Sequence, residues 1–522
     1  MLRPQSLFAA LFLALFLCGC DSKPIELPTS GETTAETAEQ KIAKWQKQAA
    51  SGNADAQFEL GKAYLNGELL PKDDEKAIAL IRKSAEHGNA EAQGLLGLLI
   101  AIGEIVPKDL AKAAEWYQKS AEQGNSSAQL QLGIAYFHGD GVKKDPAKAV
   151  SIFKTVADKG NASAQFHLGN AYLFGESVPQ DTEKAISLFQ KAADQGDVGA
   201  QFTLGLMYFK GEKVAKDAPR GVALIKEAAT DGYPSAQHYY GIAYFLGEGV
   251  PKDVAKAIEW FGKAAEQGDA ESQYALGTAY RFGEGVTRDP TRAVDWFRKS
   301  AEKGNAAAQR DLGTAYRIGF GVQKDTLKAA DWTRAAANQG DTEAQTELGR
   351  AYYAGLGVPK DLAKAVEWYR KAAEQKDPAA LDLLGLAYLK GDGVPNDDAK
   401  ALDLFQQSAG LGNAAAQLRL GMFYYTGVGV QKNPLKAATL FEKSAEQGNA
   451  GAQYFFGLAY FNGEGVPKDV VLSYAWANLA AAQDQSKELR DAIEKVASKE
   501  EIQEAQRLSS AWKPGQSIVR KN

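Results

Sequence analysis

The sequence contains very little cysteine or histidine. Both cysteines, Cys18 and Cys20, lie near the amino end, so the chain after Cys20 cannot form an internal disulfide. Only four histidines occur in the whole chain. A sequence this poor in thiols and imidazoles lacks the ligand sets of the common zinc sites. We expect no metal and no cofactor.

The sequence also lacks an excess of either charge. It contains 60 Lys and Arg residues against 65 Asp and Glu residues, and the two signs are mixed along the chain. Surfaces that bind nucleic acid need clustered cations. The composition therefore predicts no nucleic-acid partner, and net charge alone identifies no other partner class.

Long hydrophobic runs are absent apart from one near the amino end. Arg3 precedes an apolar run from Leu7 to Leu17, which is too short to span a bilayer comfortably and is typical of a signal peptide. The run ends in Leu-Cys-Gly-Cys, which resembles the lipobox of bacterial lipoproteins. This resemblance implies that residues 1–20 form the signal segment and that Cys20 carries the lipid. An ordinary secretory peptide with two chance cysteines is the alternative.

A lipidated amino end predicts a body that is tethered to a membrane and not embedded in it. Residues 21–37 are rich in Pro, Thr, Ser and Glu, which is typical of a disordered tether. We therefore expect a lipid-anchored protein of the bacterial cell envelope that faces the periplasm. Asp21 resembles the signal that retains lipoproteins in the inner membrane, so the expectation leans towards that membrane.

The rest of the chain is periodic. A glutamine within an Ala-Gln or Ser-Gln pair returns at steps of 36 residues, and we call this position the anchor. The one exception is Leu381, which keeps the phase. The anchors are Gln57, Gln93, Gln129, Gln165, Gln201, Gln237, Gln273, Gln309, Gln345, Leu381, Gln417 and Gln453. The period predicts twelve repeats over residues 53–485.

Each repeat has the signals of two helices. The first helix follows a capping residue such as Asn125 and stops at a glycine such as Gly139. A short loop leads to a second capping residue such as Asp145, and Pro146 follows at the first helical position, where a missing N–H costs little. We expect an all-α fold, an α/α superhelical solenoid of twelve helical hairpins.

Both ends of the array have signals of capping helices. Thr37 with Gln40 predicts a capping box for a helix within residues 38–52, and Ser498 with Glu501 predicts another within residues 486–522. Such helices would cover the open faces of the terminal repeats.

Glycine recurs within the first helix, as at Gly241, although a mid-helix glycine costs about 1 kcal/mol relative to alanine. We expect close approach of the second helix there, with small residues such as Ala257 and Ala265 facing it. The tryptophans at equivalent positions of the second helices, such as Trp260 and Trp476, are predicted to lie in the core and not to line a ligand site.

The motifs Ala-x-Ala-Gln-x-x-Leu-Gly-x-x-Tyr and Gly-x-Gly-Val-x-x-Asp-x-x-Lys-Ala-x-x-Trp-Phe resemble the Sel1-like repeat, a relative of the tetratricopeptide repeat, over residues 40 to 485. The resemblance implies a non-catalytic scaffold that binds partner proteins. Recognition of an acidic polysaccharide is the alternative. A β-lactamase-like enzyme is a more distant one, because the cysteine pair of those Sel1-like proteins is missing. The departure at Lys376-Asp377-Pro378, followed by Leu381, predicts a bend.

The histidines do not indicate catalysis. His87, His138, His167 and His238 occupy four different positions of the repeat, so they cannot form one column of ligands or bases. The sequence predicts no catalytic residue.

The resemblance also implies which side chains meet a partner. In tetratricopeptide-like arrays the first helix lines the concave groove, with positions one, five, eight and nine after the anchor pointing into it. The predicted partner-binding residues, flanked by Phe245, are Tyr239, Tyr274, Arg281, Arg310, Arg317, Arg350 and Tyr353. Four arginines without an acid in their own columns would suit an anionic partner. The alternative is that they are solvated, or paired with Asp311 and Glu347.

Overall fold

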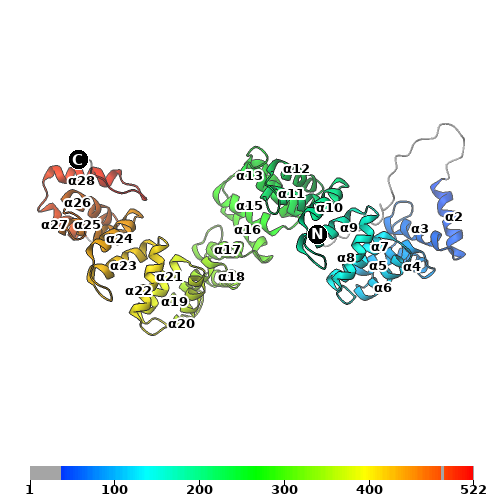
Figure 1. The fold of residues 1–522 in the computed structure, drawn as a ribbon, viewed down its shortest axis with the longest axis horizontal. Coiled ribbons are helices and arrows are strands. Elements are labelled where there is room, and N and C mark those ends of the chain that lie inside the picture. Colours follow the sequence, from blue (N-terminus) through cyan, green and yellow to red (C-terminus); the bar gives the residue numbers. More distant parts are fainter. Residues whose placement is uncertain (1–36, 484–486, 521–522) are drawn as a thin grey trace. The chain divides into compact units, whose positions relative to one another are not determined.

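The computed structural model describes residues 37–483 and 487–520. Within these ranges all regular structure is helical, which confirms the all-α solenoid (Figure 1). The predicted signal segment, the lipid site Cys20 and residues 21–36 of the predicted tether lie outside the described residues. In the part that is described, no helix is long and apolar enough to cross a membrane.

Each of the twelve repeats is one helical hairpin. The first helices are α3 (Ala54–Asn66), α5 (Ala90–Ile102), α7 (Ser126–His138), α9 (Ala162–Phe174), α11 (Val198–Lys210), α13 (Pro234–Leu246), α15 (Ala270–Phe282), α17 (Ala306–Ile318), α19 (Thr342–Ala354), α21 (Pro378–Lys390), α23 (Ala414–Thr426) and α25 (Ala450–Asn462). The second helices are α4 (Asp74–Glu86), α6 (Leu110–Glu122), α8 (Pro146–Asp158), α10 (Thr182–Asp194), α12 (Ala218–Thr230), α14 (Val254–Glu266), α16 (Pro290–Glu302), α18 (Thr326–Asn338), α20 (Leu362–Glu374), α22 (Asp398–Gly410), α24 (Pro434–Glu446) and α26 (Val470–Ala481).

The helix ends follow the predicted capping chemistry. In the sixth repeat, α13 stops at Gly247, whose φ of 75° is left-handed and therefore favours glycine. The loop closes when the Asp253 N–H donates to the Tyr244 carbonyl (2.9 Å). The Asp253 side chain then accepts from the Lys256 N–H and caps α14. The sequence therefore fixes where each hairpin turns.

The anchor glutamine holds neighbouring hairpins together. Gln237 is buried. Its side-chain Nε2 donates to the carbonyl of Ala229, in the preceding second helix (3.2 Å), and its Oε1 accepts from Gln267, at the end of its own second helix (2.8 Å). Most repeats show the same contacts, so one amide side chain links three helices.

The fifth and tenth repeats depart from this pattern. In the fifth, Asp231 stands where other repeats have a donor, and the Oε1 of the buried Gln201 has no hydrogen-bond partner among the described residues. In the tenth, a buried Leu381 replaces the anchor glutamine and Leu411, at the position of its usual partner, is 48% exposed. In the tenth repeat, leucine therefore replaces both the anchor glutamine and its usual hydrogen-bond donor.

The mid-helix glycines lie against the second helix, as expected, but a different side chain fills the contact. A Cβ on Gly241 would lie 2.6 Å from Cε1 of Phe261 and 3.2 Å from the Ala257 carbonyl oxygen. Ala257 faces the glycine through its carbonyl oxygen, as expected, but the nearest side chain is that of Phe261. An aromatic ring needs the room that the missing Cβ leaves.

The tryptophans contact the core, as predicted. Trp476 is almost fully buried. Trp260 is half-buried and packs against the core cluster that contains Tyr240, while the Lys263 ammonium lies 3.8 Å from its ring centroid. The rings are thus covered by the protein itself.

The described chain forms two compact units, which divide between Ser272 and Gln273. In the first unit, α2 (Ala38–Ala50) begins with the predicted Thr37–Gln40 capping box and covers the first repeat. In the second unit, α27 (Glu488–Glu494) and α28 (Lys499–Ala511) follow the last repeat, and α28 has the predicted Ser498–Glu501 capping box. Both capping helices are confirmed.

The connection at Lys376 keeps the geometry of the other repeats. Lys376 takes a left-handed φ of 62°, where ten other repeats have glycine. The N–H groups of Lys376 and Asp377 donate to the carbonyls of Ala373 and Ala372. One repeat earlier, Gly340 and Asp341 make the equivalent hydrogen bonds within their own repeat. The bend at this point stays a prediction.

We predict that Asp231→Gln stabilises the first unit. The new amide would donate to the unmatched oxygen of Gln201, for a gain of about 1 kcal/mol in the free energy of unfolding. The matched control is Gln267→Asp, which removes the donor from Gln237 and should cost about 1–3 kcal/mol. Hydrogen exchange of α11 and α13 amides measures both. Faster exchange of α11 amides in Asp231→Gln would contradict the assignment.

Candidate functional site

The first helices of the second unit carry charged side chains that form three groups of ion pairs. We call these residues the polar ladder. Side chains of successive first helices contact one another in it, so positions one, two, five and eight after the anchor share one surface, the first-helix face. The ladder comprises Arg281, Arg310, Arg317, Arg350 and Arg419 with Asp311, Asp341, Glu343, Glu347 and Asp382.

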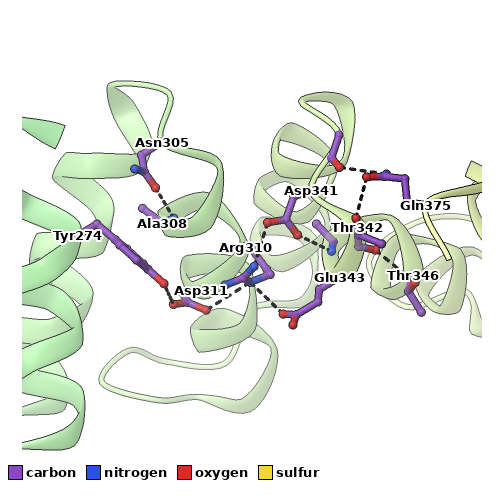
Figure 2. A network of polar contacts seen from close by, with 12 residues as sticks. Tyr274, Asn305, Ala308, Arg310, Asp311, Asp341, Thr342, Glu343, Thr346 and Gln375 are labelled. Atoms are coloured by element: carbon purple, nitrogen blue, oxygen red, sulfur yellow. Dashed lines mark hydrogen bonds and ion pairs between the residues drawn. The ribbon is translucent and has the colours of Figure 1, made fainter. Parts of the chain in front are cut away.

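Arg310 on α17 is the most connected member (Figure 2). Its Nη1 lies 2.9 Å from Asp341, and its Nε lies 3.3 Å from Glu343 and 3.6 Å from Asp311. Burial lowers the pKa of Arg310, but these carboxylates, Asp341 foremost, raise it, and the net direction is upward. Asp341 also caps α19 by accepting from the Ala344 N–H. Arg310 is therefore a fixed link between two helices.

Asp311 contacts two side chains of α15, Tyr274 and Arg281. The Tyr274 hydroxyl donates to Asp311 (3.1 Å), and Nη1 of Arg281 lies 3.4 Å from the same carboxylate oxygen. Burial, followed by the Asp311 charge, raises the pKa of Tyr274. The Tyr274 ring packs on Phe297, with 5.7 Å between centroids. One face of this predicted aromatic contact is therefore already occupied.

Arg317 and Arg350 share a single carboxylate. Glu347 lies 3.8 Å from Nε of Arg317 and 3.3 Å from Nη1 of Arg350. Both guanidinium groups are about half exposed, with side-chain exposures of 49% and 50%. Beside them the Tyr353 hydroxyl donates to Asp392 (2.9 Å). This is the most open part of the ladder.

The ladder ends in a buried ion pair that the sequence analysis missed. Nη1 of Arg419 on α23 lies 2.5 and 2.6 Å from the two oxygens of Asp382 on α21. Asp382 is only 8% exposed, and burial raises its pKa although Arg419 opposes the shift. The signal was the spacing: Asp382 and Arg419 are 37 residues apart, as are Tyr274 and Asp311.

The four predicted arginines are therefore paired. The expectation of columns without an acid is wrong for Arg310, because Asp382 stands in the same column. The acids that pair with the arginines come from other columns, and Glu347 lies on the same helix as Arg350. The alternative of pairing with Asp311 and Glu347 is confirmed, and a set of uncompensated guanidinium groups is not present. Whether Arg281, Arg310, Arg317, Arg350, Tyr274 and Tyr353 bind a partner stays a prediction.

Tyr239 and Phe245 belong to the first unit. The Tyr239 ring packs on Phe202 of α11 (5.7 Å between centroids), and Lys210 lies 5.3 Å from its centroid. Lys252 lies 5.8 Å from the Phe245 ring centroid. Both rings are partly buried, and a binding role for them also stays a prediction.

The first unit brings together a serine, a histidine and an aspartate that do not form a catalytic triad. Nδ1 of His238 lies 2.8 Å from the Ser272 hydroxyl and 3.7 Å from Asp269. In a triad the serine and the acid contact opposite ring nitrogens, whereas here both approach the same one, and Ser272 is fully buried. Among the described residues no cluster of His, Cys, Asp and Glu could hold a metal ion.

Comparison with known proteins identifies the repeat. The Sel1 repeat model matches twelve consecutive segments, from residues 54–89 to residues 450–485. A protective antigen of uropathogenic Escherichia coli strains, described as displaying an SLR fold, is 34% identical, with 92% of this chain and 99% of that chain covered and a TM-score of 0.57. A Sel1 repeat protein from Oxalobacter formigenes is 36% identical over 63% of this chain and 98% of that one, with a TM-score of 0.44. No curated protein matches the chain.

We predict that Arg419→Ala destabilises the second unit by about 3 kcal/mol, because it leaves the buried Asp382 carboxylate without its counter-ion. The double variant Asp382→Leu with Arg419→Met should recover most of the loss, since no charge then stays buried. Denaturant unfolding measured by circular dichroism compares the two. Equal stability of Arg419→Ala and the unmodified chain would show that the pair is unimportant.

Proposed function

The chain belongs to the Sel1 repeat family, and we propose that it is a membrane-tethered scaffold of the bacterial cell envelope that binds partner proteins on its first-helix face. Sel1 repeat proteins generally mediate protein–protein interaction, and the family is generally non-catalytic. The proposal adds the location, the tether and the surface.

One observation carries the choice of surface. The columns that build the hairpin hardly vary along the chain: eleven of twelve anchors are glutamine, and the glycine four residues later is present in every repeat. The column directly after the anchor holds eight residue types in twelve repeats. The same hairpin forms with all of them, although Phe58 and Leu130 are buried in the core and Arg310 is partly exposed. A face whose chemistry can change without changing the fold is suited to recognition.

The tether is supported by the sequence of the amino end. The apolar run ends in the lipobox-like Leu-Cys-Gly-Cys string, and Cys20 is the last cysteine of the chain. A diacylglycerol with a further acyl chain would supply enough buried apolar surface for stable membrane attachment. Cys20 would thus hold the solenoid at the membrane and leave its first-helix face accessible.

An acidic polysaccharide is the second candidate partner. Arg350 and Tyr353 support it, since both side chains are exposed and a guanidinium beside an aromatic ring suits an acidic sugar. The pairing of Arg317 and Arg350 with Glu347 weighs against it, because a saccharide would compete with an existing carboxylate. We therefore favour a protein.

We predict that a photoreactive amino acid at Arg317 crosslinks partner proteins in living cells. Asp331, on the second helix of the same repeat and 70% exposed, serves as the control site and should give no specific adduct. Mass spectrometry identifies the adducts. Crosslinks from Asp331 only, or none along the whole first-helix face, would refute the proposed surface.

We predict that Cys20→Ser moves the protein from the membrane fraction to the soluble fraction, because the thiol that would receive the lipid is gone. Cys18→Ser is the matched control and should remain in the membrane pellet. Incorporation of labelled fatty acid gives a second readout. A Cys20→Ser protein that stays in the pellet and still takes up label would contradict the tether.

A further inference from the structure

Exposed apolar side chains occur near the carboxyl ends of the first helices in three consecutive repeats of the second unit, and we call them the apolar row. Phe282 and Ile318 are the last residues of α15 and α17, and Leu356 lies just beyond α19. They are 61%, 58% and 55% exposed. Isolated apolar side chains on a surface are normal, whereas a row of them at one end of successive helices marks an interaction surface.

The loop beside this row has lost its acid in two of the three repeats. The position eleven residues after the anchor is acidic in nine repeats, namely Glu68, Glu104, Asp140, Glu176, Glu212, Glu248, Glu284, Asp392 and Glu464. In the eighth and ninth repeats the same position holds Phe320 and Leu356, and Val428 is the third exception. Phe320 packs against the core of its repeat. The negative column is therefore interrupted in the eighth and ninth repeats, whereas Glu284 remains close to Phe282 in the seventh.

The nearest cations are half-exposed guanidinium groups. Arg317 directly precedes Ile318, and it shares the carboxylate of Glu347 with Arg350. Within ion-pair distance the two guanidinium groups share one carboxylate, and Asp392 accepts a hydrogen bond from the neighbouring Tyr353. The carboxylate is also less exposed than either guanidinium, at 33% against 49% and 50%. The outer surface therefore presents apolar groups beside positive charge.

We propose that this rim, defined as Phe282, Ile318, Leu356, Arg317 and Arg350, binds an extended segment of a partner protein in which apolar residues are spaced by acidic ones. The inference rests on the proposed function and specifies its partner. Apolar side chains of the segment cover the row, and one of its carboxylates pairs with Arg317 and Arg350.

The spacing of the repeats sets the pattern of the segment. Packed helices lie about 8–10 Å apart, and an extended chain advances about 3.3 Å per residue. Successive points of the row therefore meet about every third residue of the segment. Two of the three apolar residues, Ile318 and Leu356, are aliphatic and offer neither a π face nor a hydrogen bond to a sugar ring, so the row favours a peptide over a polysaccharide.

The test uses the full chain and a fluorescein-labelled peptide of repeated Leu-Glu-Ser triplets, with binding measured by fluorescence anisotropy. Leu356→Glu restores the acid that other repeats carry at this position, so the hairpin tolerates it. It should weaken binding at least tenfold. Glu104→Leu, the reverse change in the second repeat, is the matched control and should leave the affinity unchanged.

Three outcomes overturn the rim. The first is that the peptide does not bind to the unmodified chain. The second is that Leu356→Glu binds the peptide as tightly as the unmodified chain does. The third is that oligogalacturonate displaces the peptide while Ile318→Glu leaves the affinity for the peptide unchanged. Ile318→Glu and Leu356→Glu should each lower the affinity for Leu-Glu-Ser triplets more than for Leu-Lys-Ser triplets. Crosslinks from Arg317 together with an inert rim would leave the proposed function standing and remove only this inference.

Discussion

A buried amide links neighbouring hairpins in eleven of the twelve repeats. A primary amide in a dry interior needs partners for its oxygen and its nitrogen, because an unmatched polar group costs about 1–3 kcal/mol. Gln237 and its equivalents find them in the last turn of the preceding second helix and at the end of their own second helix. The register between neighbouring hairpins follows, since a shift of one residue would break both contacts. The distance between successive first helices is then fixed as well.

That fixed register explains the polar ladder. A charged side chain one position after an anchor meets the side chain two positions after the next anchor, as Asp382 meets Arg419. A side chain eight positions after an anchor also contacts the side chain two positions after the next anchor, as Arg317 contacts Glu347. Most of these pairs are partly exposed, and such pairs stabilise a protein by about 0–1 kcal/mol. Asp382 and Arg419 differ because burial makes each dependent on the other. The ladder therefore adds specific contacts between helices more than overall stability.

The two surfaces of the second unit have different chemistry. The ladder pairs its own charges and leaves little for a partner, apart from the half-exposed guanidinium groups of Arg317 and Arg350, which share one carboxylate. The rim beside it has exposed apolar groups, and the Arg281 guanidinium lies 5.2 Å from the centroid of the Phe282 ring. A partner that contacts both gains apolar burial from one and orientation from the other. In such an array, the repeats that depart from the common residue give the surface its specificity. Leu356, for example, replaces the acid of its column.

The sequence by itself determined the hairpins, the caps and the number of repeats, because these depend on local signals such as Asp253 and Gly247 and on a period without insertions. It also identified the predicted arginines as lying on one type of surface. Only the tertiary structure decided what they contact. Arg281 and Asp311 are 30 residues apart and stand in different columns, and a comparison of equivalent positions cannot show that they meet. Likewise, the glycine column reveals a close approach, but the Phe261 ring that fills it depends on how two helices cross. The spacing of residues along the sequence predicts the contacts within a repeat, whereas the contacts between repeats depend on the register that the buried amide imposes.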